Sequence, residues 1–138
     1  MKSMREEGLR LIREVEGILR RDARGALTDK DFNLVVRRAQ EVVELALKGA
    51  LKMLGVDYPK VHDVAPLFSD RLRQKKGVGD PTVLQKIEEA SLWLAQSRAP
   101  SFYFDREYGE EDAEQALKDA AFVLNEVKEL LGLSRKEP

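Results

Sequence analysis

Residues 37–68, RRAQEVVELALKGALKMLGVDYPKVHDVAPLF, decide the fold of this chain. They join the second part of an amphipathic helix to a short loop that holds His62, the only histidine in the sequence. Apolar residues recur every three or four positions, which indicates a helix with a wide apolar face. Gly55 suits the end of that helix, and Asp63 suits the cap of the next one. The segment therefore predicts two consecutive helices of an all-α protein.

Size and charge limit the classes of function. The chain has 138 residues, enough for one domain with a substantial core. Hydrophobic residues make up 43% and charged residues 36%, so a core and a charged surface are both expected. Twenty-four Lys and Arg against twenty-five Asp and Glu give a net charge of -1. Such a chain has no global attraction to nucleic acid or anionic membrane, and binding of either requires a local patch.

Several kinds of site are not expected. The sequence has no cysteine, which excludes disulfides, thiolate metal sites and thiol nucleophiles. Residues 1–17 alternate charged and apolar side chains, unlike a signal peptide, and no apolar run approaches the ~20 residues of a membrane span. Gly77-Val78-Gly79 lacks the lysine and serine of a phosphate loop. We expect a cytoplasmic protein with no metal, cofactor or membrane contact.

Helical periodicity extends along almost the whole chain. Gly25 and Gly132 are expected to end the first and last helices, and Thr28 to cap the second. Pro100 disfavours a helix at the residue before it, so the fourth helix should end near Arg98 and an aromatic loop should follow as far as Gly109. The predicted helices cover about residues 4–24, 29–54, 64–76, 80–98 and 110–131.

Helices joined by short loops predict an up-and-down bundle of four or five helices. We expect one domain over residues 1–138, with a frayed tail at about 133–138. Gly49 falls in the middle of the longest helix, where glycine is unfavourable, so another backbone should pack closely there.

Three short motifs follow one another along the chain. They are AQEVVELALKGAL with Glu44 four residues before Lys48, the His62-Asp63 pair, and Ser97-Arg98-Ala99-Pro100 ahead of the closing helix. Their order and spacing resemble the HEPN family of small helical, nucleotide-associated domains. The resemblance implies a helical bundle and a homodimer with a cleft between its subunits.

The chain departs from the pattern of HEPN ribonucleases. Those proteins resemble each other in an arginine separated by four to six residues from a following histidine. Before His62 these positions hold Gly55, Val56 and Asp57. RNA cleavage without a metal needs a group that takes the 2′-hydroxyl proton, and arginine does not exchange protons near neutral pH. No catalytic residue is therefore predicted, and the sequence argues against an enzyme of the usual HEPN type.

Five residues are the candidates for contacting a nucleotide or RNA. His62 could bind a phosphate or order its own loop. Arg98 could hold a phosphate or a nucleobase beside the aromatic loop, or bond to the last carbonyls of its helix. Tyr103 could stack on a base, cover the end of the bundle or contact a second copy. Arg71 and Arg73 form a local basic patch, or else a solvated helix end.

Two further charge patterns have alternative explanations. Glu44 and Lys48 have the spacing of a surface ion pair, and equally of a polar cluster that faces a groove. Arg20, Arg21 and Arg24 repeat a basic run at the end of the first helix. RNA binding would gain support if this run faced the same groove as the basic patch near residue 73.

Three hypotheses of function follow. The first, implied by the resemblance, is a non-catalytic HEPN module that binds a nucleotide, a partner minimal nucleotidyltransferase or both, as in a toxin–antitoxin pair. The second is a divergent metal-independent ribonuclease that uses Arg98 with Tyr103 or Asp105. The third is a structural oligomerisation domain.

Overall fold

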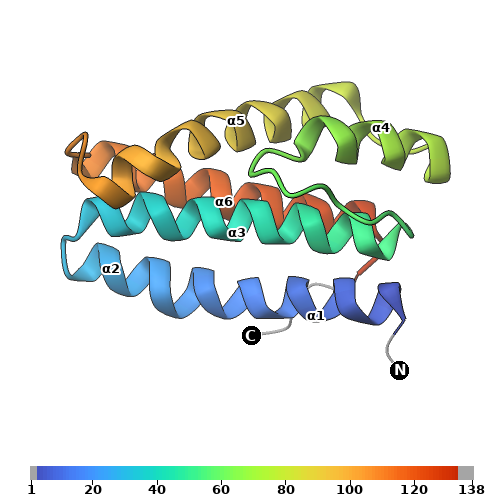
Figure 1. Cartoon of the computed structure of the whole chain (residues 1–138), viewed down its shortest axis with the longest axis horizontal. Coiled ribbons are helices and arrows are strands. Elements are labelled where there is room, and N and C mark those ends of the chain that lie inside the picture. Colours follow the sequence, from blue (N-terminus) through green and yellow to red (C-terminus); the bar gives the residue numbers. More distant parts are fainter. Residues whose placement is uncertain (1–2, 134–138) are drawn as a thin grey trace.

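All regular structure in residues 3–133, the part that the computed structural model describes, is helical (Figure 1). The first three helical segments follow one another without a break over residues 4–28 and form one continuous rod. Counted as one helix together with the four later helices, they confirm the expected bundle of five helices. The predicted tail, apart from its first residue, lies outside the described residues. The elements are α1 (Met4–Gly17), the π-helix η1 (Ile18–Ala23), α2 (Arg24–Thr28), α3 (Phe32–Met53), α4 (Ala65–Lys76), α5 (Pro81–Tyr103) and α6 (Glu110–Leu130).

The long helix α3 lies at the centre of the bundle. It packs against α1, α5 and α6, while α4 lies against α5 and the end of α3 (Figure 1). A helix with neighbours on three sides needs the wide apolar face that the sequence predicted. Its fully buried side chains are Val35, Val36, Ala39, Val42, Ala46, Leu47, Ala50 and Leu51.

The predicted close approach at Gly49 is confirmed. A Cβ atom at Gly49 would lie 2.8 Å from the backbone oxygen of Gly8 on α1, and a Cβ atom at Gly8 would collide with the backbone oxygen of Gly49. The two glycines therefore allow the backbones of α1 and α3 to touch. This contact places α1 against the α3 face that is turned away from α5.

The boundary between the first two helices differs from the prediction. The first helix does not end at Gly25 but continues through a π-helical turn to Thr28, because Ala26 beside the glycine is buried in the core. Thr28 is not a cap, since its hydroxyl bonds back to a carbonyl of its own helix. Lys30 takes the left-handed conformation with φ 60°, and Asp31 caps α3.

The fourth helix also continues past its predicted end. Helix α5 includes Pro100 and ends at Tyr103, and Phe104 leaves it in the left-handed conformation. A proline removes one helical hydrogen bond, and the carbonyl that loses it belongs to the exposed residue Gln96, where water can bond to it. Arg98 therefore lies inside a helix and not at its end, and half of the predicted aromatic loop is helical.

A buried asparagine holds this last turn of α5 in place. The Asn33 amide nitrogen donates to the carbonyls of Ser101, at 3.2 Å, and Arg106, at 2.9 Å. Its amide oxygen accepts from the backbone N–H of Tyr108 at 2.9 Å. Asn33 is only 6% exposed, so one side chain on α3 fixes both the end of α5 and the loop that leads to α6.

Several other predicted boundaries hold. Gly55, Gly77 and Gly132 all have positive φ, as expected for residues that follow helix ends. Asp80 caps α5 by accepting from the N–H of Thr82 at 2.8 Å. In residues 3–133 no helix combines the length and hydrophobicity that a membrane crossing requires.

Candidate functional site

A cleft of about 330 Å³ lies where α3, α5 and the loop before α4 meet. It brings together three of the predicted binding residues, His62, Arg98 and Tyr103, which are far apart in the sequence. The residues that line it are Arg37, His62, Ala95, Arg98, Ala99, Phe102 and Tyr103.

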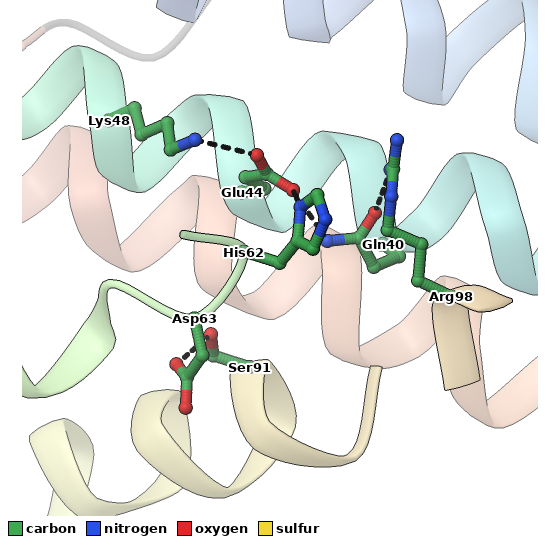
Figure 2. Close-up of polar contacts among 7 residues, drawn as sticks. All are labelled: Gln40, Glu44, Lys48, His62, Asp63, Ser91 and Arg98. Carbon is green, nitrogen blue, oxygen red and sulfur yellow. Dashed lines mark hydrogen bonds and ion pairs between the residues drawn. The ribbon is translucent and has the colours of Figure 1, made fainter. Parts of the chain in front are cut away.

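A chain of polar contacts runs beneath this cleft (Figure 2). The Arg98 guanidinium donates to the Gln40 amide oxygen at 2.7 Å, and the Gln40 amide nitrogen donates to Glu44 at 2.8 Å. Glu44 also accepts from Lys48 at 2.7 Å and lies 2.9 Å from Nδ1 of His62. Arg98 and His62 are thus connected through side chains of α3.

Glu44 is the centre of the network. Its side chain is 12% exposed and that of Lys48 is 10% exposed, so this is not a surface ion pair. Burial is the largest single influence on the pKa of Glu44 and would raise it, but hydrogen bonds from Lys48, Gln40 and His62 together outweigh burial and lower that pKa. Glu44 is therefore a stable anion at neutral pH.

His62 reaches the cleft from the loop between α3 and α4. Because Nδ1 is bonded to the Glu44 carboxylate, neutral His62 carries its proton there and leaves Nε2 as an acceptor. The imidazole is 55% exposed, so a ligand can reach it. The partner of His62 is thus a carboxylate on α3, which the sequence did not predict.

Asp63 holds the loop between α3 and α4 (residues 54–64, here called the histidine loop) on the side away from His62. Its carboxylate accepts from the Ser91 hydroxyl at 2.6 Å and from the N–H of Ala65 at 3.3 Å (Figure 2). Val64, and not Asp63 as predicted, occupies the N-cap position of α4. Asp63 therefore ties the histidine loop to α5 as well as to α4.

Arg98 points from α5 towards α3 across the cleft. It does not bond to the last carbonyls of its helix, which was the alternative explanation, because α5 continues beyond it. Within the described residues only one of its terminal nitrogens donates a hydrogen bond, to Gln40. The remaining N–H groups of a half-buried guanidinium at a cleft wall are available to an anionic ligand.

The part of α5 that follows Arg98 gives the cleft an aromatic lining. The rings of Phe102 and Tyr103 meet edge to face at 4.7 Å, and the Arg37 guanidinium lies 4.0 Å from the centre of the Phe102 ring. Tyr103 is 68% exposed, so its ring is available for stacking. Tyr108 is instead buried and covers the end of the bundle.

Sequence reasoning did not select Arg37 or Gln40 as site residues. Both have a signal that could have revealed them: with Glu44 and Lys48 they fall three or four residues apart on one face of an otherwise apolar helix. A polar stripe on such a helix indicates that this face does more than pack in the apolar core. Here the stripe runs from Arg37 at the cleft to the buried ion pair of Glu44 and Lys48.

Arg71 and Arg73 do not line the cleft. They lie on α4, where Arg73 is exposed and donates to the Ser69 carbonyl of its own helix at 3.4 Å. The grooves that Arg20 lines contain neither of them, so the two basic runs do not face one groove. Among residues 3–133 no three His, Cys, Asp or Glu side chains are grouped so that they could hold a metal ion.

The fold and cleft define a small all-α bundle with a site suited to a ligand that has an anionic group and a flat ring. Comparison with known families agrees with the helical fold. The model described as HEPN domain matches residues 10–130, and the chain therefore belongs to the HEPN family.

A curated relative extends the comparison. The chain is 32% identical over 108 residues to a protein of Methanocaldococcus jannaschii named "Putative toxin MJ1304", with 70% of each chain covered. No solved structure matches this chain.

Proposed function

We propose that this chain is the non-catalytic HEPN component of a toxin–antitoxin-like pair, and that its cleft binds a nucleotide, a partner minimal nucleotidyltransferase or both. The relative named as a toxin supports the setting. The observation that carries the proposal is the network that fixes Arg98 and His62 at the same cleft, which exposed aromatic rings also line.

Each wall of the cleft suits a different part of a nucleotide. The free N–H groups of Arg98 and the accessible edge of His62 suit a phosphate. Tyr103, with its exposed ring, suits a base, which gains about 1–3 kcal/mol by stacking on an aromatic side chain. A volume of about 330 Å³ is at the lower end of the range for small-molecule pockets, which fits part of a nucleotide.

A thermal shift assay tests nucleotide binding. ATP at a concentration about 100-fold above its Kd adds roughly 2.7 kcal/mol to the stability of a protein that binds it only when folded. We expect nucleotides to raise the melting temperature of the wild type and of the surface control Arg5→Gln, and to leave that of Arg98→Gln unchanged. Equal shifts in all three proteins would place the nucleotide elsewhere, and no shift at millimolar concentration would remove nucleotide binding from the proposal.

The same cleft supports a second candidate, a metal-independent ribonuclease. The chain lacks the arginine–histidine motif in sequence, but Arg98 and His62 line one cleft in space. Glu44 orients Nδ1 of His62 and leaves Nε2 as a base for a 2′-hydroxyl, while Arg98 could stabilise the phosphorane. His62 thus replaces Tyr103 or Asp105 as the partner of Arg98 in this hypothesis.

RNA incubation separates the two candidates. A binding module leaves total cellular RNA intact. Cleavage that is lost in both His62→Ala and Arg98→Ala, and retained in Arg5→Gln, would establish the ribonuclease and overturn the non-catalytic proposal.

We also propose a homodimer. The resemblance implies a homodimer, but the apolar faces of α3 and α6 are buried in the core of one copy, so a second copy needs another surface. Leu92, Ala99 and Tyr103 are exposed and fall on one face of α5 by their spacing. A dimer through this stripe would bring two clefts close together, as the resemblance implies.

A further inference from the structure

A second groove follows α1 and η1 where they face α6. Its larger part has a volume of about 730 Å³, and a smaller part of about 280 Å³ shares Glu16, Arg20 and Lys128 with it, so the two are continuous. Figure 1 places α1 and α5 at opposite edges of the bundle, with α3 and α6 between them. This groove is therefore separate from the cleft.

Two cations in the groove are already neutralised. Lys128 is 7% exposed and donates to Glu16 across the floor at 2.8 Å. Arg21 is paired with Asp22 at 3.0 Å. Neither cation is available to a ligand without breaking an existing pair.

Four other arginines remain for a ligand. Arg10, Arg13, Arg20 and Arg24 are all exposed, line the two parts of the groove, and have no acidic partner within residues 3–133. Their spacing of three, seven and four residues keeps them on one side of the rod, over a length of about 21 Å. Gly17 between them adds no side chain, which keeps the groove open at its centre. The chain as a whole has a charge of -1, so this row is a local concentration of positive charge.

The other lining residues define the class of ligand. Among the apolar lining residues, Ile12, Leu19 and Leu124 are at most 8% exposed. Leu9 and Leu133 are partly exposed, so a protein segment would bury the apolar surface of only these two side chains there. None of the residues that line the groove is aromatic, so unpaired bases would find no ring on which to stack. A row of guanidinium groups without either feature suits a phosphate backbone.

We propose that this arginine groove, defined by Arg10, Arg13, Arg20 and Arg24, binds the phosphate backbone of a nucleic-acid duplex without reading its sequence, with duplex RNA as the probe. A duplex conceals its bases and presents phosphates, which matches what the groove offers. The π-helical turn falls within the arginine row, in keeping with the frequent occurrence of such turns at functional sites. The inference does not depend on what the cleft binds.

Fluorescence anisotropy with a labelled RNA duplex of about 16 base pairs, the span of a typical duplex-RNA-binding module, tests this proposal. Two variants remove charge from the groove, Arg13→Gln with Arg20→Gln, and Arg10→Gln with Arg24→Gln. The matched control, Lys75→Gln with Lys76→Gln, removes the same charge from the exposed end of α4. We expect each groove variant to weaken binding about tenfold and to lower the slope of log affinity against log salt by about one to two, with the control within about twofold of wild type.

Four results would overturn the proposal. The wild type could fail to bind the duplex at about 50 mM salt, where backbone contacts are strong. The control could lose as much affinity as the groove variants, which would indicate non-specific attraction. Arg98→Gln could abolish duplex binding, which would place the RNA in the cleft. Finally, polyglutamate could displace the duplex at equal charge concentration, which would indicate a site for acidic protein segments.

Discussion

Glu44 shows how one residue connects stability to the candidate site. Its carboxylate accepts from three side chains that belong to α3 and the histidine loop. Lys48 is slightly more buried than Glu44, and its ammonium group also lies 5.0 Å from the centre of the Tyr58 ring. Removing the carboxylate would leave this cation buried without a counterion, a change that is far more costly than the loss of an exposed ion pair.

Glu44→Gln should lower the free energy of unfolding by about 2–4 kcal/mol at neutral pH, because the buried Lys48 charge loses its partner. Glu41→Gln is the control, since its pair with Arg38 is more exposed and should contribute about 0.5 kcal/mol. Urea unfolding followed by circular dichroism measures both. Equal losses in the two variants would contradict a buried role for Glu44.

The same residue predicts a dependence of stability on pH. Folding lowers the pKa of Glu44 from its ordinary value of 4.5, so the folded state favours the anion. The resulting stabilisation is complete above pH 4.5 and disappears as pH falls through the lower folded pKa. Urea unfolding between neutral and acidic pH should show a smaller loss for Glu44→Gln than for the wild type. Parallel pH profiles would contradict the lowered pKa.

At the scale of single residues, the sequence predicted some residues of the candidate site and missed others, for a physical reason. His62, Arg98 and Tyr103 were predicted as binding candidates, because each is a rare or chemically suitable residue in a loop or near one. Gln40 and Arg37 were not selected, although they continue the polar stripe of Glu44 and Lys48, because the stripe alone does not show whether that face of α3 meets a cleft. Their role depends on which helix lies opposite them, and that is decided by tertiary packing.

At the scale of the element, the helices end where packing and capping agree and not where propensity alone would stop them. Gly25 did not end the first helix, and Pro100 did not end α5. In each case contacts from distant residues outweigh the local cost of a glycine or proline inside a helix, which is about 1–3 kcal/mol relative to alanine. Asn33 provides such contacts for α5, and nothing near Pro100 in the sequence indicates them. Element existence was predictable because hydrophobic periodicity is local, whereas these two boundaries depend on long-range contacts.

Glycine contacts between α1 and α3 give a test at this scale. Gly49→Ala should destabilise the fold by about 1–3 kcal/mol, because the added methyl group would press on the α1 backbone. Gly25→Ala is the matched control: a Cβ atom there meets nothing within 4 Å, and the helix should gain up to about 1 kcal/mol. Thermal unfolding of both variants compares them. A Gly49→Ala protein as stable as Gly25→Ala would contradict the backbone contact.

Asn33→Ala should cost about 2–4 kcal/mol and free the end of α5, since its three backbone partners lose their hydrogen bonds in a buried position. Hydrogen exchange should show faster exchange over residues 101–109 than in the wild type, with α1 less affected. Uniformly faster exchange through all helices would mean that the asparagine supports the whole bundle and not this segment.

At the scale of the whole molecule, exposed apolar residues gather on and near α5, beside the cleft. Leu92→Asp should place a charge in the proposed dimer contact and reduce the dimer fraction at least about tenfold, a change equivalent to 1.4 kcal/mol. Val78→Asp is the control, because Val78 has similar exposure, 43% against 49%, but lies in the loop before α5. Light scattering at micromolar concentration measures the dimer. A monomeric wild type, or equal effects of the two substitutions, would contradict the proposed surface.

We propose that this HEPN chain acts through its cleft, by binding a nucleotide, a partner minimal nucleotidyltransferase or both. The most direct test is a native pull-down of the tagged wild type, Arg98→Gln and the surface control Arg5→Gln, with mass spectrometry of the proteins and nucleotides that remain bound. We expect a stoichiometric nucleotidyltransferase, a nucleotide or both with the wild type and with Arg5→Gln, and their loss with Arg98→Gln. Wild-type protein recovered with neither would contradict the proposal.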